Sequence, residues 1–134
     1  MNISTFDDLL QAARQQAQPQ RLLFVFARAE LPADSDARQR EAFLQGRGGA
    51  LVPLMCVDKL PRELATFAAL EQESRAFGKD WSILFAAALS GQAGQAPSSE
   101  AAEKPMQQMV ESIKAGSIGA YIPFDRQGDA VALE

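Results

Sequence analysis

The 134 residues predict one domain, and 47% hydrophobic with 22% charged residues is an ordinary balance for a globular protein. The chain has no histidine and a single cysteine, Cys56, which excludes within this chain Ser-His-Asp and Cys-His catalysis, a disulfide and a zinc site built from cysteines. A net charge of −4 and scattered basic residues argue against nucleic acid as a partner.

The first residues lack the apolar segment of a signal peptide, and the longest apolar run, residues 83–89, is much shorter than a membrane-spanning helix. A lone cysteine fits a reducing compartment. The sequence therefore predicts a cytoplasmic protein that makes no membrane contact and uses no metal or other cofactor.

Residues 4–17 predict an amphipathic helix that Ser4 can cap. Its apolar stripe consists of Phe6, Leu9, Leu10, Ala13 and Ala17. Residues 21–28 predict a strand with apolar residues on both faces, so we expect this strand to be buried in the middle of a sheet.

The connection over residues 29–49 is long for a compact domain, in which structureless segments of this length are uncommon. It predicts a short helix that begins at Ser35 or Asp36 and runs to Leu44, with Gly46 closing it. Few apolar side chains are available to this helix, so we expect it at the periphery.

Residues 50–57 predict the second strand, in which Pro53 must occupy a strand start, a bulge or an edge because it has no N–H group. Residues 61–78 then predict a helix that begins at Pro61 and ends at Gly78. Its expected buried face consists of Leu64, Phe67, Ala68, Leu70 and Phe77.

Residues 81–89 predict the third strand, and a polar loop over residues 90–99 leads to a helix over residues 99–115. The continuous apolar stripe of this helix consists of Ala102, Met106, Met109, Val110 and Ile113. Residues 118–124 and 130–133 predict a C-terminal hairpin.

Together these elements predict one α/β domain over residues 1–134, with a central sheet of about five strands, crossover helices and a C-terminal β-hairpin. The right-handed crossover rule favours a common face of the sheet for the helices at 61–78 and 99–115, which would give a two-layer sandwich. No internal repeat or low-complexity tract interrupts the chain.

The loop over residues 90–99 is the best candidate for a ligand site, because glycines let backbone N–H groups approach a ligand and the next helix start favours an anion. The residues expected to bind are Ser90, Gly91, Gly94, Ser98 and Ser99. The glycine spacing matches neither a P-loop nor a dinucleotide motif, and the loop has no basic residue. The alternative is a structural loop in which Ser98 or Ser99 caps the helix.

Three other sites, with five residues in all, are chemical candidates. Asp58 and Lys59 follow the second strand, where they could perform acid–base chemistry or decorate a turn. Cys56 lies in an apolar strand, so we expect it to be buried as a small hydrophobe. Asp125 and Arg126, at the hairpin tip, could contact a partner or serve the turn itself.

Three stretches together resemble a known family: RLLFVFARAELP (21–32), GALVPLMCVDK (49–59) and AGSIGAYIPFDRQG (115–128). It is a family of short proteobacterial proteins that often carry the label "ribonucleotide reductase subunit alpha". The resemblance implies a bacterial source and brings no known activity, cofactor or catalytic residue. The residues do not support the label, because a reductase catalytic subunit needs several cysteines and this chain has only Cys56.

From these features we expect a non-catalytic interaction or accessory domain that forms a homo-oligomer or binds a protein partner. The alternative is a small-anion or nucleotide-binding protein that uses the loop at 90–99 and the following helix start. A third alternative, an enzyme, would require the side chains of Asp58 and Lys59 to share one cleft.

Overall fold

The centre of the protein is a four-stranded sheet in which every neighbouring pair of strands is antiparallel. The computed structural model describes residues 3–31, 36–44, 50–78 and 80–132. In sheet order, the strands are β2 (Ala50–Lys59), β1 (Gln20–Glu30), β3 (Ile83–Ser90) and β4 (Ile122–Phe124). The mixed α/β class is therefore confirmed, whereas the prediction of about five strands is wrong for the described residues.

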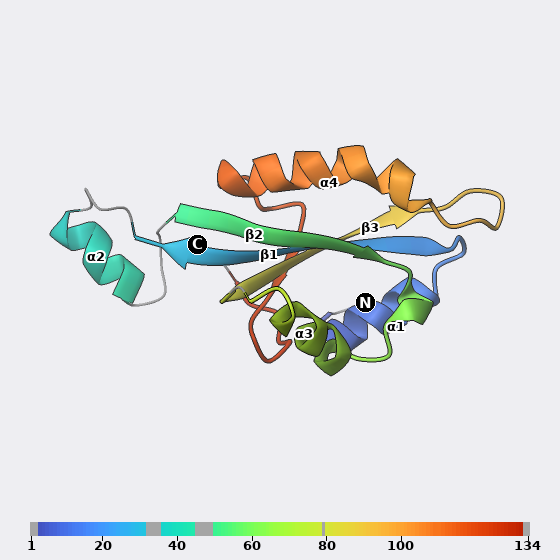
Figure 1. Ribbon diagram of the computed structural model, residues 1–134, viewed down its shortest axis with the longest axis horizontal. Coiled ribbons are helices and arrows are strands. Elements are labelled where there is room, and N and C mark those ends of the chain that lie inside the picture. Colours follow the sequence, from blue (N-terminus) through green and yellow to red (C-terminus); the bar gives the residue numbers. More distant parts are fainter. Residues whose placement is uncertain (1–2, 32–35, 45–49, 79, 133–134) are drawn as a thin grey trace.

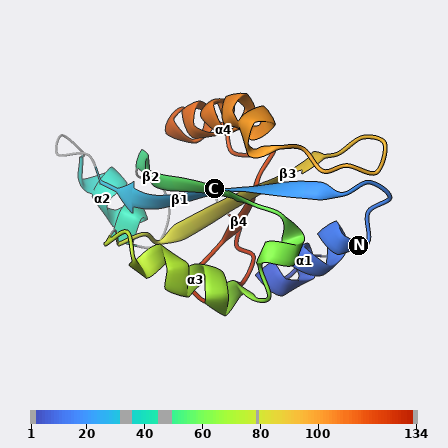
Figure 2. The ribbon, with the colours of Figure 1, turned by 45° about the vertical axis from the view of Figure 1, so that its right-hand side comes forward.

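Helices cover both faces of this sheet (Figure 1). One face carries α1 (Phe6–Arg14), the short 3-10 helix η1 (Pro61–Glu63) and α3 (Phe67–Arg75), and the other face carries α4 (Ser99–Lys114). Figure 2 shows the resulting three layers from a second direction. None of the helices in the described part of the chain is both long and apolar enough to cross a bilayer.

The predicted two-layer sandwich is wrong because the crossover rule applies to only one of the two helices. α3 connects β2 to β3, which run parallel on either side of β1, and this is a true crossover. α4 connects β3 to its antiparallel neighbour β4, so handedness does not constrain it. It covers the opposite face, over β1 and β2.

Strand β1 lies between β2 and β3, as its doubly apolar pattern predicts. Leu22, Phe24 and Phe26 face the core under α1 and α3. The alternate residues Leu23, Val25 and Ala27 face the core under α4. One strand thus contributes to both hydrophobic cores.

Helix α1 is shorter than the predicted span of residues 4–17, and Thr5 rather than Ser4 caps it. Ala17, predicted in its apolar stripe, lies beyond the helix and is exposed. The Thr5 hydroxyl accepts a hydrogen bond from the Asp8 amide at 3.2 Å, and the Asp8 carboxylate accepts one from the Thr5 amide at 3.1 Å. This reciprocal capping box satisfies two backbone donors at the helix start.

The helix predicted over residues 61–78 is two helices. Leu64 is extended between η1 and α3, and Thr66 caps a new helix by accepting a hydrogen bond from the Ala69 amide at 3.3 Å. Because α3 ends at Arg75, Phe77 falls outside it and is 51% exposed, so its predicted burial is wrong, as is that of the exposed Ala68.

The connection between β1 and β2 contains α2 (Ala37–Leu44), which lies apart from the other helices at one end of the sheet (Figure 1). The short peripheral helix is thus confirmed, while Gly46, expected to close it, lies outside the described residues. α4 matches its prediction closely: Ser98 caps it, and Ala102, Met106, Met109 and Ile113 are buried.

The C-terminal hairpin is not formed by the described residues. β4 has three residues, and its return arm makes only an isolated bridge between Phe124 and Ala130. The chain instead turns to the start of α1: the Ala130 amide donates to Ser4 O at 2.8 Å, and the Phe6 amide donates to Gly128 O at 2.7 Å. Backbone bonds to the N-terminal segment, at the other end of the sequence, take the place of a longer hairpin ladder.

Candidate functional site

The loop between β3 and α4, residues 90–99, directs four of its backbone donors to acceptors within the protein. The Gln92 and Gln95 amides each donate to the other residue's carbonyl, at 3.0 and 2.9 Å. The Gly91 amide donates to Pro19 O at 2.8 Å, and the Gly94 amide donates to Gln18 Oε1 at 2.9 Å. These N–H groups therefore already have protein acceptors, which weakens their predicted role in holding an anion.

The glycines of this loop serve its conformation. Gly94 has a φ of +76°, in the left-handed region that glycine adopts without strain. A Cβ at Gly91 would collide with the carbonyl oxygen of Gln95 and come within 2.7 Å of Pro19 O. Gly91 thus permits the close approach of two backbone segments rather than of a ligand.

Two predicted ligand serines also have structural partners. The Ser98 hydroxyl accepts a hydrogen bond from the Ala101 amide at 3.0 Å, as expected for the cap of α4. The Ser90 hydroxyl accepts one from the Gln20 side chain at 3.2 Å, which links the ends of β1 and β3. The alternative of a structural loop therefore accounts for both side chains.

The remaining predicted serine, Ser99, lies beside Asp58 and Arg21. The Arg21 guanidinium forms an ion pair with Asp58 at 2.7 Å and donates to Pro97 O at 2.6 Å. The Ser99 hydroxyl donates to the same Asp58 carboxylate. This cluster fastens the loop at 90–99 to the ends of β1 and β2, and it unites two predicted site residues.

Arg21 was missed by the sequence prediction, although a signal for it exists. In the antiparallel register, Leu23 of β1 lies opposite Asp58 of β2, so Arg21 is the diagonal neighbour of Asp58 on the same sheet face. Recognising this pair required knowledge that β1 and β2 are neighbours with that register.

Asp58 and Lys59 point to opposite faces of the sheet. Lys59 forms an ion pair with Glu73 of α3 at 2.9 Å, whereas Asp58 pairs with Arg21 near the start of α4. Adjacent strand residues alternate between faces, so the two side chains do not share a cleft. The predicted acid–base pair is therefore wrong.

A groove lies beneath the loop at one end of the sheet. Its walls come from the end of α1 and the following connector (13–20), the segment 60–62 at η1, Arg21, and loop residues 94–98, which include Gly94 and Ser98. Its volume is about 650 Å³, within the range of about 300–1,000 Å³ typical of small-molecule sites. Ser90 and Gly91 line a smaller hollow of about 320 Å³ beside the same loop.

Three arginines, Arg14, Arg21 and Arg62, line the groove. Arg14 is held in place by hydrogen bonds from Nη2 to Leu64 O at 2.6 Å and Pro61 O at 3.3 Å. Arg62 is exposed and forms no ion pair with any of the described residues. The arginines come from α1, β1 and η1, so no local sequence pattern identifies them as a group.

Cys56 is exposed, so its predicted burial is wrong. β2 is an edge strand, and a residue there lacks a neighbour on one side. In the described residues, no group of three or more Cys, Asp or Glu side chains is arranged to hold a metal ion.

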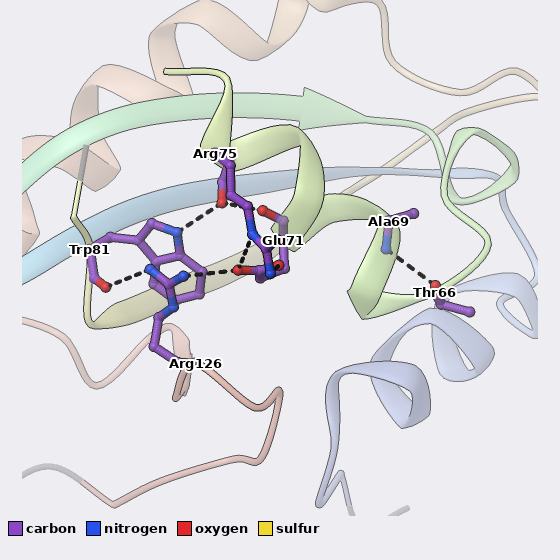
Figure 3. Close-up of polar contacts among 7 residues, drawn as sticks. Thr66, Ala69, Glu71, Arg75, Trp81 and Arg126 are labelled. Carbon is purple, nitrogen blue, oxygen red and sulfur yellow. Dashed lines mark hydrogen bonds and ion pairs between the residues drawn. The ribbon is translucent and has the colours of Figure 1, made fainter. Parts of the chain in front are cut away.

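A second polar cluster surrounds the buried Trp81. Figure 3 shows Arg126 lying over the Trp81 ring, with its guanidinium carbon 4.3 Å from the ring centroid. Arg126 also donates to Trp81 O at 3.0 Å and to Glu71 at 2.8 Å. The Trp81 indole N–H donates to the Ser74 hydroxyl at 2.9 Å, so the one polar group of this buried side chain has a partner.

This cluster is structural. A hydrogen bond from Arg75, together with the charges of Arg75 and Arg126, holds the pKa of Glu71 below its usual range. Arg126 points inward and joins the C-terminal segment to α3, while the Asp125 carboxylate accepts hydrogen bonds from the amides of Gln127 and Asp129. The turn role predicted as the alternative for this pair therefore accounts for the contacts of Asp125. Arg126 instead makes its contacts with Trp81 and with Glu71 of α3, away from the turn.

Comparison of the chain with protein-family models, curated proteins and solved structures gave no match in any of the three. The family resemblance drawn from the sequence stays a prediction, and it supplies no residue to either site.

Proposed function

We propose that this chain is a non-catalytic interaction domain that associates with a second copy of itself through β2. The observation that carries the proposal is the outer side of this strand of 10 residues, which pairs with no strand among the described residues. An open edge presents backbone donors and acceptors that another strand can bond.

The side chains of β2 support self-association. Its apolar residues are only half-buried: Leu51, Val52, Leu54, Met55 and Val57. A second β2 aligned antiparallel to the first would bond the open backbone groups and cover these side chains in both copies. Because both copies would use the same surface, this contact closes as a two-fold dimer.

Within β2, we place the pairing in the second half of the strand. Pro53 lacks an N–H group, and the register shifts between Phe26 and Ala27 of β1, opposite this proline, as expected for a bulge at an edge. Beyond the bulge, residues 55–59 pair regularly with β1. They include the exposed Cys56, so a dimer contact here would lie around that side chain.

The opposite edge of the sheet is a poorer candidate. β4 has three residues, and one of them is Pro123. A short strand with a proline offers few backbone groups for pairing. The proposal therefore places the contact at β2 rather than at β4.

The test is the molar mass of the purified chain, measured by light scattering over a range of concentrations. We expect the mass to rise from that of a monomer to that of a dimer. Cys56→Lys, which places like charges around the two-fold axis, should shift the chain toward monomer. Ala88→Lys, at an exposed position of β3, is the matched control and should dimerise like the parent.

Circular dichroism of both variants distinguishes lost association from lost folding. A monomeric mass at every concentration, or a Cys56→Lys variant that dimerises as well as the parent, would contradict the proposal.

A further inference from the structure

We propose that the groove beneath the loop at 90–99 binds a small organic anion, with its oxyanion held by Arg14 and Arg62 and its apolar body against the groove walls. The oxyanion can be a phosphate or a carboxylate, because the planar arginine fork matches both. The proposal does not depend on dimerisation through β2.

The charge around the groove favours an anion even though the chain carries a net charge of −4. Three arginines line it, and the two carboxylates nearest to them in sequence already have partners. Asp58 pairs with Arg21, and the Glu63 carboxylate accepts a hydrogen bond from the Leu60 amide at 2.7 Å. Among the described residues, no ion pair joins Arg14 or Arg62 to a carboxylate.

Arg14 is oriented before any ligand arrives. Its two hydrogen bonds to Pro61 O and Leu64 O both leave from Nη2. The donors on Nε and Nη1 bond no acceptor in the described part of the chain, so they remain available to an oxyanion. A side chain fixed in this way loses less conformational entropy when it binds.

The walls between the arginines are mainly small and apolar. They include Ala13, Ala17, Leu60, Pro61, Ala96 and Pro97. Such walls add affinity for the carbon skeleton of a ligand, whereas inorganic phosphate would leave them uncovered. The groove volume of about 650 Å³ and the scattered basic residues elsewhere favour a small molecule over a polyanion.

The test titrates the full chain with four probes: phenyl phosphate, benzoate, inorganic phosphate and benzyl alcohol. We expect phenyl phosphate, benzoate or both to bind more tightly than inorganic phosphate and benzyl alcohol. Binding should shift the NMR signals of amides in the segments 13–17 and 94–98. A preference for phenyl phosphate identifies a phosphate ligand, and a preference for benzoate identifies a carboxylate; either result supports the proposal.

Arg62→Gln should weaken binding of the preferred probe about tenfold. The matched control is Arg38→Gln, the same charge change at an exposed arginine of α2 outside the groove, which should leave the dissociation constant unchanged. The proposal is overturned if neither organic anion binds at millimolar concentration, if Arg62→Gln binds like the parent, or if inorganic phosphate binds as tightly as the organic anions.

Discussion

The two faces of the sheet are covered in different ways. On one face, α1, η1, α3 and the C-terminal segment meet around aromatic rings: Phe6, Phe24, Phe26, Phe67, Trp81 and Phe124. On the other face, a single helix, α4, lays the stripe Ala102, Met106, Met109 and Ile113 over Leu23, Val25 and Phe85. We refer to these as the aromatic face and the α4 face.

The difference shows how much each core depends on long-range assembly. On the α4 face, one helix with a regular apolar period suffices, since its side chains are already aligned before it meets the sheet. The aromatic face must gather segments from the whole length of the chain, and it uses specific polar contacts to do so. Phe67 N donates to Asp7, Arg14 donates to Leu64 O, and Arg126 donates to Glu71.

The largest expected effect comes from removing the ring at the centre of the aromatic face. Phe6 is fully buried, and its ring centroid lies 5.3 Å from those of Phe24 and Phe67 and 5.5 Å from that of Phe124. We expect Phe6→Ala to lower the free energy of unfolding by about 4 kcal/mol, and Met109→Ala on the α4 face to lower it by about 3 kcal/mol.

Urea unfolding of both variants measures the two losses in the free energy of unfolding. Methionine is flexible and its neighbours can close part of the cavity, whereas three rings around Phe6 cannot. If Met109→Ala proves more destabilising than Phe6→Ala, the aromatic face is not the more tightly assembled of the two.

The next largest effect is a difference in stability cost between alanine substitutions at two glycines that have nearly the same φ. Gly116, after α4, has a φ of +80°, and Gly128, on the aromatic face, has a φ of +85°. A Cβ at Gly116 meets nothing within 4 Å, but one at Gly128 comes within 2.9 Å of the Phe67 ring. We expect Gly116→Ala to cost about 1 kcal/mol and Gly128→Ala about 2–3 kcal/mol.

Thermal and urea unfolding of the two alanine variants check this difference. The shared positive φ makes each glycine the control for the other, so the excess cost at Gly128 reports the contact with Phe67. Equal costs for the two substitutions would mean that Phe67 moves aside freely.

The smallest effect concerns pH. A hydrogen bond from Arg75 lowers the pKa of Glu71, and backbone hydrogen bonds from Ser4 and Thr5 lower the pKa of Asp8. Each folded-state pKa lies below the unfolded one, so the stability that these carboxylates add is present above the unfolded values of about 4. It is lost as the pH falls through the folded values.

Urea unfolding of the parent and of Glu71→Gln checks this prediction at two pH values. One, pH 6, lies about two units above the unfolded pKa values, and the other, pH 3, lies about one unit below them. The variant should lose less stability between the two conditions, because it has no charge to lose at position 71. An unchanged pH dependence in Glu71→Gln would show that the contacts between α3 and the C-terminal segment do not depend on that charge.

The sequence by itself determined the elements whose signals are local. Periodicity and capping residues within short stretches of sequence predict three of them: the doubly apolar strand β1, the capped helix α4 with its apolar stripe, and the peripheral helix α2. The structural alternatives for Ser98 and Asp125 were also local, since a cap and a turn need only neighbouring residues.

Only the tertiary structure decided which faces, edges and side chains came together. In the folded chain, α4 and α3 cover opposite faces of the sheet, and β2 lies at an edge where Cys56 is exposed. The segment predicted to complete a hairpin bonds instead to the residues at the start of α1. The tertiary structure also brought three arginines from separate elements around one groove. Periodicity fixes which residues of one element share a face, but strand order and long-range hydrogen bonds depend on the free energy of the whole packed chain.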